Sequence, residues 1–531
     1  MSEWETDLST DVLVLGGGPA GTWAAVTALE AGARVVLADK GYCGTSGAAA
    51  AGGNNLWFIS PDDTEKREAS IAMRHRVGGE LSEHSWMHRT LDETWRGVHR
   101  LVDWGYPFPT DDDGNPLRSS LQGPQYMRLM RHRVQRLGGR ILDQSPAASL
   151  TTDSDGRVAG ATGVHRQGHR GAWQVSAGAV VLATGGCAFL SGALGCNPNT
   201  GDGALMAAEL GVPFSGMEFS NAYGMAPGFG AQTKGRMYQL ARYYTADGVQ
   251  LDVPEGSAGR AAVSRHLIDQ QIYARLDLAP PHLHEQLRWS QPNFFLPYDK
   301  AGIDPFTQLF PVRMILEGTV RGTGGLRLVS GECETGVPGL YAAGDVASRE
   351  PITGGVSGGG SHNGAWAIST GSWAGTAAAR YATAAAFRLR PLSEPRATAR
   401  PHPTTTGRTD PDEVVRIVQE QVTPLGTNMF RRADRLGTAL AVLDGLWADA
   451  VPALRVEPGP RAHRAREAAA MVAHARWMYR AALARPESRA MHHRDDAPEL
   501  DPAYTRRLLT GGLDQVWTDW EAVGKQQGDA A

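Results

Sequence analysis

Three glycines near the N-terminus, Gly16, Gly18 and Gly21, form a GxGxxG pattern, and Asp39 follows at close to the ~20-residue spacing of a dinucleotide-binding site. The first glycine permits a tight turn, the second lets a pyrophosphate approach the backbone, and the third lets a helix pack on a strand. The N-terminus of that helix offers partial positive charge to phosphate. We therefore expect Asp39 to bond the ribose hydroxyls. The predicted contacts of this turn also include Pro19, Ala20 and Lys40.

Residues 11–40 contain the elements that would position this turn. The segment opens with the apolar run DVLVL, continues as a helix to Gly32, and ends in a second apolar strand at Asp39, which predicts a βαβ unit. Residues 140–186 then read as short strands, with a hairpin turn at SDGR (154–157) and a buried strand AVVLAT. The predicted fold class is α/β, with a Rossmann-like domain.

The chain divides into five predicted regions. Residues 1–215 and 331–387 form two segments of the Rossmann-like domain. Residues 216–330, richer in aromatic and mixed polar residues, form an inserted α+β cap domain. Residues 388–410, dense in proline and threonine, form a linker. Residues 411–531 carry apolar residues at three- and four-residue steps, which predicts a C-terminal helical domain.

Composition excludes several classes of protein. The 531 residues are 42% hydrophobic, and their net charge of -4 is scattered, so we expect a globular protein that binds no nucleic acid. The N-terminus MSEWETDLST lacks signal features and no run of ~18 apolar residues stands out, so we expect a cytoplasmic protein without a membrane segment. Four cysteines without a C-x-x-C pair argue against disulfides and against a metal or iron–sulfur site in this chain alone.

Two later segments decide between FAD and a nicotinamide cofactor, which both suit the GxGxxG turn. AVVLATGG (179–186) and GLYAAGD (339–345) are signatures of an extended FAD that lies along the carboxyl ends of several strands. With GGGPAG, DKGYCGTSGAAAAGG, NTGDG, MEF and ESRAMHHRDDAP, they make the chain similar to one family. The chain resembles the flavoprotein subunits of fumarate reductase and succinate dehydrogenase, a family that includes aspartate oxidase and the adenylylsulfate reductase flavoprotein. The resemblance implies an FAD-dependent oxidoreductase whose Rossmann-like domain binds FAD.

The resemblance also implies a set of contacts to FAD. Thr45, Ser46 and Gly47 would lie near the flavin ring, Asp202 would help to hold FAD, and Asp345 would bond the ribityl chain. Some family members attach FAD to a histidine, and TSGAAAAGG contains none, so we expect non-covalent FAD. The remaining expected contacts are Gly52, Gly53, Ala183, Thr184, Gly185, Gly344, Gly360 and Ser361.

A second glycine-rich stretch, GGVSGGGSHNGAW (354–366), precedes a segment that reads as a helix. Under the resemblance, glycines 358 to 360 let the backbone approach a flat flavin ring. The following helix would then aim its N-terminal N–H groups at the pyrimidine end, where they stabilise negative charge. The alternative is that these glycines serve only tight helix packing.

GRAAVSR (259–265) resembles the family segment whose arginine acts as acid or base opposite the flavin, which places Arg260 in the catalytic position. Arg265 is the alternative substrate-facing arginine, and a surface role at the start of a cap helix is the alternative for both. The histidine and second arginine with which family members clamp dicarboxylates have no evident counterparts in TVRGTGG (319–325) and VSGGG (356–360). We therefore do not expect succinate or fumarate as the substrate.

The segment VSGGGSHNG is similar to a stretch of the adenylylsulfate reductase flavoprotein, and there His362 would face the flavin. A structural hydrogen-bonding role is the alternative for this histidine. The expected function is redox chemistry through flavin N5 on a small polar substrate. One alternative is an adenylylsulfate-reductase-like flavoprotein that works with an iron–sulfur, ferredoxin-like partner. The other is an electron-transfer flavoprotein subunit without a substrate of its own.

Overall fold

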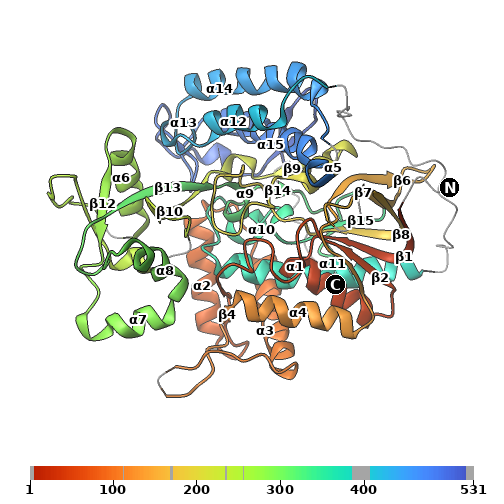
Figure 1. Ribbon diagram of the computed structural model, residues 1–531, viewed down its shortest axis with the longest axis horizontal. Coiled ribbons are helices and arrows are strands. Elements are labelled where there is room, and N and C mark those ends of the chain that lie inside the picture. The colour runs from red at the N-terminus through yellow and green to blue at the C-terminus, as the bar shows by residue number, and fades with distance from the viewer. Residues whose placement is uncertain are drawn as a thin grey trace.

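The computed structural model describes residues 5–111, 113–167, 171–233, 236–254, 256–384, 407–457 and 459–521. A seven-stranded sheet forms its centre, with the strand order β5-β2-β1-β8-β7-β6 and with β15 paired to β8. Most of the predicted linker, 388–410, lies outside the described residues. Figure 1 shows the sheet between the C-terminal helices above and α1 and α11 below.

The predicted βαβ unit is confirmed at the middle of this sheet. Strand β1 (Thr6–Leu15) leads into α1 (Pro19–Glu30), and β2 (Val35–Ala38) returns parallel to β1. On the other side of β1, β8 (Ala172–Leu182) is also parallel, and β15 (Leu340–Ala342) adds to β8. The carboxyl ends of these parallel strands meet at one edge, where nucleotides bind in open α/β sheets.

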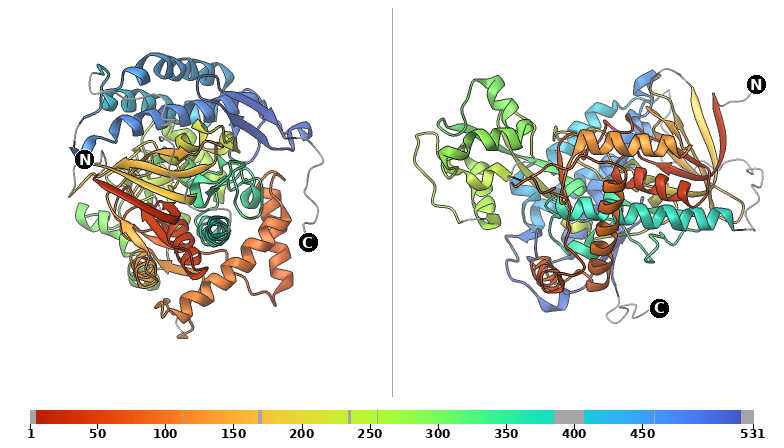
Figure 2. Two further views of the ribbon diagram at one scale, coloured as in Figure 1. Left: turned by 90° about the vertical axis from the view of Figure 1, so that its right-hand side faces the viewer. Right: turned by 90° about the horizontal axis from the view of Figure 1, so that it is seen from below.

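Both faces of the sheet are buried, which explains the unbroken apolar run of β1. Leu13 and Leu15 pack into the core formed with the C-terminal helices, while Val12 and Val14 pack against the side that holds α1 and α11. Helix α11 (Ser361–Thr383) runs beside α1 under the sheet, as both views of Figure 2 show. Glycines make this approach possible, because a Cβ on Gly375 would lie 2.2 Å from the Ala24 carbonyl oxygen.

The predicted hairpin is also confirmed. Strands β6 (Ala147–Thr152) and β7 (Val158–Val164) pair antiparallel, and the Asp153 N–H donates to the Arg157 carbonyl across the turn. Gly156 has φ +78°, a conformation that glycine adopts without strain. The hairpin extends the sheet through β7 and β8 and leaves the nucleotide edge open.

The cap has a sheet and a core of its own. Its strands follow the order β10-β13-β12-β11, all antiparallel, with β10 at Ala222–Pro227, β11 at Arg242–Tyr244, β12 at Ile272–Arg275 and β13 at Phe310–Glu317. Helices α6 (Gly256–Asp269), α7 (His284–Ser290) and α8 (Pro292–Ala301) complete it. These elements project to the left in Figure 1, beyond the end of the main sheet. The aromatic residues Phe294, Phe295, Tyr298 and Phe310 fill the cap core.

The C-terminal region contains the predicted helices α12 (Pro411–Val422), α14 (Ala433–Gly445) and α15 (Arg464–Ala484). It also ends in a hairpin that the sequence analysis did not predict, β18 (Leu508–Gly511) with β19 (Trp517–Trp520). This hairpin joins β9 (Phe214–Ser215) and β14 (Gly325–Leu326), the two strands that flank the cap insertion. The hairpin of residues 508–520 therefore lies at the base of the cap.

No membrane segment is expected from the sequence, but one helical stretch among the described residues, Ala433–Ala453, is long and apolar enough to cross a membrane. One side of it packs into the core through Leu436, Leu440 and Leu443. Asp444 pairs with Arg476 of α15 at 2.6 Å. These contacts make it a helix of the C-terminal core.

The remaining elements are short or lie around the main sheet. They are α2 (Thr64–Val77), α3 (His84–Asp103), α4 (Gly123–Arg136), α5 (Asp202–Glu209), α9 (Gly318–Arg321), α10 (Glu350–Thr353), α13 (Leu425–Asn428), β3 (Gly53–Asn55), β4 (Ser120–Gln122), β5 (Arg140–Leu142), β16 (Phe430–Arg431) and β17 (His493–Arg494).

Candidate active site

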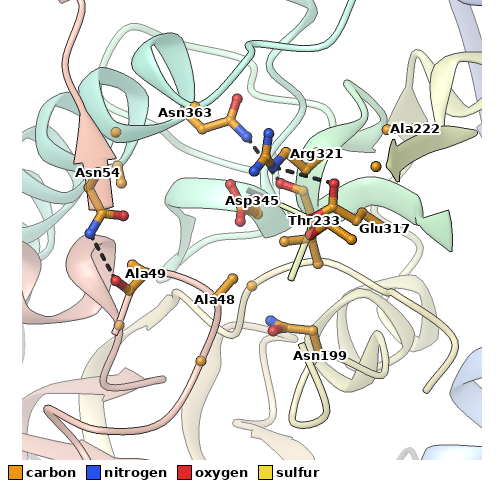
Figure 3. Close-up of a pocket in the computed structure, with 18 of the residues that line it drawn as sticks. Ala48, Ala49, Asn54, Asn199, Ala222, Thr233, Glu317, Arg321, Asp345 and Asn363 are labelled. Atoms are coloured by element: carbon orange, nitrogen blue, oxygen red, sulfur yellow. Dashed lines mark hydrogen bonds and ion pairs between the residues drawn. The ribbon is translucent and has the colours of Figure 1, made fainter. Parts of the chain in front are cut away.

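A cavity of about 870 Å³ begins at the carboxyl ends of the parallel strands and continues under the cap. Its walls come from the turn between β1 and α1, the segment 46–49, the start of α11, and cap residues that include Arg260 and Glu317. Figure 3 shows part of this lining, with Ala49 and Asn54 across the cavity from Thr233, Glu317 and Arg321. A volume of this size suits a ligand larger than one small metabolite.

The GxGxxG turn has the geometry that its sequence predicts. Gly16 has φ +111°, and a Cβ there would lie 2.2 Å from the Ala183 carbonyl oxygen. A Cβ on Gly21 would lie 1.8 Å from the Gly16 carbonyl oxygen, so Gly21 packs beneath the turn and does not line the cavity. Around Gly18, by contrast, no atom lies within 4 Å of an added Cβ. This open space, with Pro19 and Ala20 starting α1 beside it, is available to a phosphate group.

Asp39 lies at the end of β2 and holds the glycine turn. Its carboxylate accepts hydrogen bonds from the Gly17 N–H and from the Gly41 N–H, the latter at 2.6 Å. Burial raises the pKa of Asp39, and the two N–H donors counteract that effect. Asp39 also lines the cavity, so its remaining acceptor capacity faces the position expected for the ribose.

Lys40 and Asp202, both expected at the cofactor, line the cavity and bind each other. The Lys40 Nζ lies 2.6 Å from Asp202 Oδ2 and 2.7 Å from Glu467 Oε1 of α15, and it donates to Thr200 Oγ1. Burial alone would lower the pKa of Lys40, but the two carboxylates raise it above its usual value. This cluster ties the end of β2 to the C-terminal helices.

Three polar side chains in the cavity lining have an oxygen atom to which a bound cofactor could donate a hydrogen bond. Thr184 Oγ1, Asn199 Oδ1 and Asn363 Oδ1 are buried and have no hydrogen-bond partner among the described residues. Buried polar atoms are almost always paired, so three such atoms in one cavity indicate a polar ligand. Together with the open glycine turn, they fit the elongated, hydrogen-bonding FAD. Ala183 and Gly185 line the same stretch.

The second glycine-rich stretch also lines the cavity. Gly359 and Gly360 have φ +58° and +94°, and an added Cβ on either would meet no atom within 4 Å. Helix α11 begins at the next residue, Ser361, and Asn363 and Gly364 of its first turn line the cavity. Further along α11, Gly371 and Gly375 lie against the backbone of α1, so these two glycines serve tight helix packing.

Asp345, expected to bond the ribityl chain, lines the cavity beside the glycine turn that ends β15. Its Oδ1 accepts from the Arg349 guanidinium at 2.5 Å. The same guanidinium donates to the Thr319 carbonyl at 3.0 Å, which fixes the start of the segment that carries Arg321. Gly344 adopts φ +71° before Asp345, and an added Cβ would lie 2.7 Å from Ala20 Cβ.

The other expected cofactor contacts divide into two groups. Ser46, Gly47 and Gly53 line the cavity, and Ser46 Oγ accepts from the Tyr42 N–H at 2.6 Å. Three other expected contacts, Thr45, Gly52 and Ser361, lie outside the cavity lining, and Thr45 is exposed to solvent. The carbonyl oxygens of the other two, Gly52 and Ser361, accept hydrogen bonds from Gly123 and Trp57.

The three expected catalytic residues separate in the structure. Arg260 of α6 lines the cavity, and its guanidinium has no ion pair with the described residues. Arg265, one helical turn further, points elsewhere: it binds Asp495 at 3.0 Å and lies over the Phe430 ring. The geometry favours Arg260 over Arg265 as the residue that meets a ligand.

His362 was expected to face the flavin, and the structure places it outside the cavity lining. The ring is buried, tilts against Trp57 at 4.5 Å between centroids, and bonds to Arg74. Burial and the charge of Arg74 lower the pKa of His362 to about 3. A neutral, buried imidazole that holds its own loop fits the structural alternative.

The lining residues that were not predicted include Thr233, Glu317, Arg321 and His493. Glu317 ends β13, accepts from Thr233 Oγ1 at 2.8 Å, and lies 3.5 Å from Arg321 Nε. Burial and the charges of Arg431 and Arg265 lower the pKa of His493. Among these residues, only the four-residue spacing of Glu317 and Arg321 could have been noticed in the sequence, because side chains four residues apart on a helical turn can form an ion pair.

No group of three or more histidine, cysteine, aspartate or glutamate side chains that could hold a metal ion is present in the part of the chain that the structure describes. The four cysteines all lie among the described residues, are buried, and form no disulfide bond with one another. Burial raises the pKa of the Cys43 thiol to about 12, so this thiol is protonated at neutral pH.

Comparison with known proteins assigns the family. The model of an FAD binding domain matches residues 11–365, and that of the fumarate reductase flavoprotein C-terminal region matches residues 416–525. The chain therefore belongs to the fumarate reductase flavoprotein family of FAD-dependent oxidoreductases. It is 28% identical to an L-aspartate oxidase of Streptomyces coelicolor, over 94% of this chain and 91% of the relative. An L-aspartate oxidase of Mycobacterium bovis is also 28% identical, over 96% of each chain.

Solved structures show the same fold. A chain of E. coli quinol fumarate reductase matches with a TM-score of 0.81 and 21% identity, covering 99% of this chain and 98% of the other. The adenylylsulfate reductase of Archaeoglobus fulgidus matches with a TM-score of 0.71 and 18% identity, covering 97% and 96%. The expected fold class, a two-segment Rossmann-like FAD-binding domain with an inserted cap and a C-terminal helical domain, is confirmed.

Proposed function

We propose that this protein binds FAD non-covalently and oxidises or reduces a small polar organic acid, other than succinate or fumarate, between the FAD-binding domain and the cap. The observation that carries the proposal is one continuous cavity, with the glycine turn of Gly16 and Gly18 at one end and Arg260 at the other. The flavin of FAD, when bound, supplies the ability to accept or donate electrons.

The residues of the chain supply binding, orientation and exclusion of water. The α1 N-terminus and Gly18 would hold the phosphates, and Asp39 the ribose. Thr184, Asn199 and Asn363 offer their unpaired oxygens to the rest of the cofactor. Arg260 is permanently charged and would bind a carboxylate of the substrate. The cap covers this end of the cavity, which strengthens electrostatic interactions there.

Non-covalent attachment is supported by the residues around the cavity. Segment 46–49 reads SGAA, and His493 is the histidine in the described lining. Its imidazole lies on β17, in the C-terminal region. We expect purified protein to show flavin absorption bands, and acid precipitation to release all of the flavin into the supernatant. Absence of flavin bands, together with failure of added FAD to restore them, would contradict the proposal.

The L-aspartate oxidases among the relatives make L-aspartate the first substrate to test. The cap end of the cavity supports an acid that also carries a hydrogen-bond donor, because Glu317 and Thr233 lie there with Arg260 and Arg321. Anaerobic addition of L-aspartate or succinate to the FAD-loaded protein would compare them directly. Bleaching of the flavin by succinate at least as fast as by L-aspartate would contradict the exclusion of succinate.

A further inference from the structure

We infer that Glu317 neutralises Arg321 and thereby restricts the substrate to a carboxylic acid with one net negative charge and a hydrogen-bond donor near Glu317. This inference rests on the proposed function, since it assigns the substrate class of the same site. It identifies Glu317 as a residue that determines specificity.

The first step is the pairing of the two side chains. Glu317 ends β13 and Arg321 ends the single turn of α9, so they lie four residues apart on one wall of the cavity. Glu317 Oε2 lies 3.5 Å from Arg321 Nε, and Oε1 accepts from Thr233 Oγ1 at 2.8 Å. Figure 3 shows the three side chains together. The Glu317 side chain is only 2% exposed, so water screens its charge little.

The second step is the charge of the cap end of the cavity. Its charged lining residues from the cap are Arg260, Glu317 and Arg321. Glu317 cancels one of the two guanidinium charges, which leaves a net charge of one positive unit, at Arg260. The charged residues Lys40 with Asp202, and Asp345 with Arg349, are already paired at the FAD end.

The third step is the consequence for a ligand. One carboxylate can bind Arg260 in a bidentate manner. A second carboxylate near Arg321 would also lie near the buried Glu317 carboxylate, and two like charges in a weakly polar site repel strongly. An amide or ammonium group there would instead donate to Glu317. Discrimination by such an unfavourable contact is a common source of specificity.

Two ligands of nearly equal size test this inference. Succinamate has one carboxylate and one amide, whereas succinate has two carboxylates. Isothermal titration calorimetry of the FAD-loaded wild-type protein should show succinamate binding at least about tenfold more tightly than succinate. The substitution Glu317→Gln keeps an acceptor for Thr233 and removes the charge. It should raise the affinity for succinate by about tenfold or more and abolish the preference for succinamate.

Matched variants supply the controls. Glu332→Gln makes the same charge change at a half-exposed side chain that pairs with Arg380 outside the cavity lining, and it should leave both affinities within about twofold. Arg260→Gln should weaken both ligands while FAD stays bound.

Several results would overturn the inference. These are equal binding of both ligands by the wild type, an unchanged preference in Glu317→Gln, or no binding of either ligand by a protein that holds FAD. Failure to take up FAD would show in the absorption spectrum and would overturn the proposed function itself. If Glu317→Gln does not fold, the relative affinities of the wild-type protein for succinamate and succinate still test the inference.

Discussion

The guanidinium of Arg74 on α2 lies against the imidazole of His362, with Nε 3.1 Å from Nε2. Because an arginine only donates, His362 Nε2 accepts this bond, and Nδ1 lies 3.0 Å from Arg74 Nη2 and 3.2 Å from the Gly358 carbonyl oxygen. Arg74 also donates to the Ser357 carbonyl at 3.2 Å. Helix α2 thus holds both sides of the glycine loop that lines the cavity, and His362 acts as a positioning residue.

The first prediction concerns this loop. His362→Ala removes the bond to Gly358 and leaves Arg74 partly buried without its acceptor, so the loop becomes less ordered. We expect the affinity for FAD to fall by about tenfold, or ~1.4 kcal/mol. Fluorescence titration of the apoprotein with FAD measures this, with the exposed His282→Ala as control. A fall in turnover with unchanged FAD affinity would instead support a catalytic role for His362.

The second prediction concerns pH. The pKa values of buried His362 and His474 are lowered from 6.5 to about 3, mainly by burial, while in the unfolded chain both histidines titrate normally. The unfolded state therefore binds more protons between these values, and stability falls as the pH drops from about 6.5 towards 3. We expect His362→Gln to flatten the dependence of the unfolding free energy on pH between 6 and 4, roughly by one proton. An unchanged slope in urea titrations at several pH values would contradict this prediction.

The third prediction separates the two kinds of glycine in the GxGxxG turn. Gly16→Ala forces a positive φ on alanine and a clash with Ala183, so we expect the apoprotein to lose about 2 kcal/mol or more. Gly18→Ala meets no atom of the protein, so its apoprotein should be as stable as the wild type. Its FAD affinity should nevertheless fall by about tenfold, because the methyl group enters the space expected for phosphate. Thermal unfolding with and without FAD distinguishes the two outcomes.

The fourth prediction concerns the buried cluster of Lys40, Asp202 and Glu467. Lys40→Met removes the cation that Asp202 and Glu467 share and leaves only His463 beside Asp202 and Arg464 beside Glu467, so we expect a loss of about 3 kcal/mol in the unfolding free energy of the apoprotein. Denaturant titration measures it, with the exposed Lys66→Met as the control. Weaker FAD binding at unchanged apoprotein stability would mean that Lys40 serves the cofactor and not the fold.

The fifth prediction compares two arginines of α6. Arg260→Gln removes a guanidinium charge that lines the cap end of the cavity and has no ion pair with the described residues, so we expect kcat/KM for an acidic substrate to fall about a hundredfold, or ~2.7 kcal/mol. Arg265→Gln breaks the ion pair with Asp495 and the contact with the Phe430 ring, both outside the cavity lining, and should change kcat/KM less than about threefold. FAD content, measured from the spectrum, should stay unchanged in both variants. A larger effect of Arg265→Gln would contradict the assignment.

Much of the cofactor end was predictable because its signals are local. The strand, the glycine turn and the helix of residues 11–40 depend on hydrophobic periodicity and on backbone conformations that only glycine adopts easily. The same is true of the hairpin at 154–157. Such patterns act between neighbours in the chain, so they can be read without knowing what else packs against them.

The sequence by itself determined the dinucleotide turn, the sheet around it and the family. Only the tertiary structure decided which side chains meet under the cap. Thr233, Glu317 and Arg260 come from separate strands, loops and helices, and no spacing in the chain encodes their convergence. Likewise, only the packing of α2 turns His362 away from the cavity, and only long-range pairing joins the C-terminal hairpin to β9. The direction of a side chain depends on contacts distant in sequence, and those contacts exist only in the folded protein.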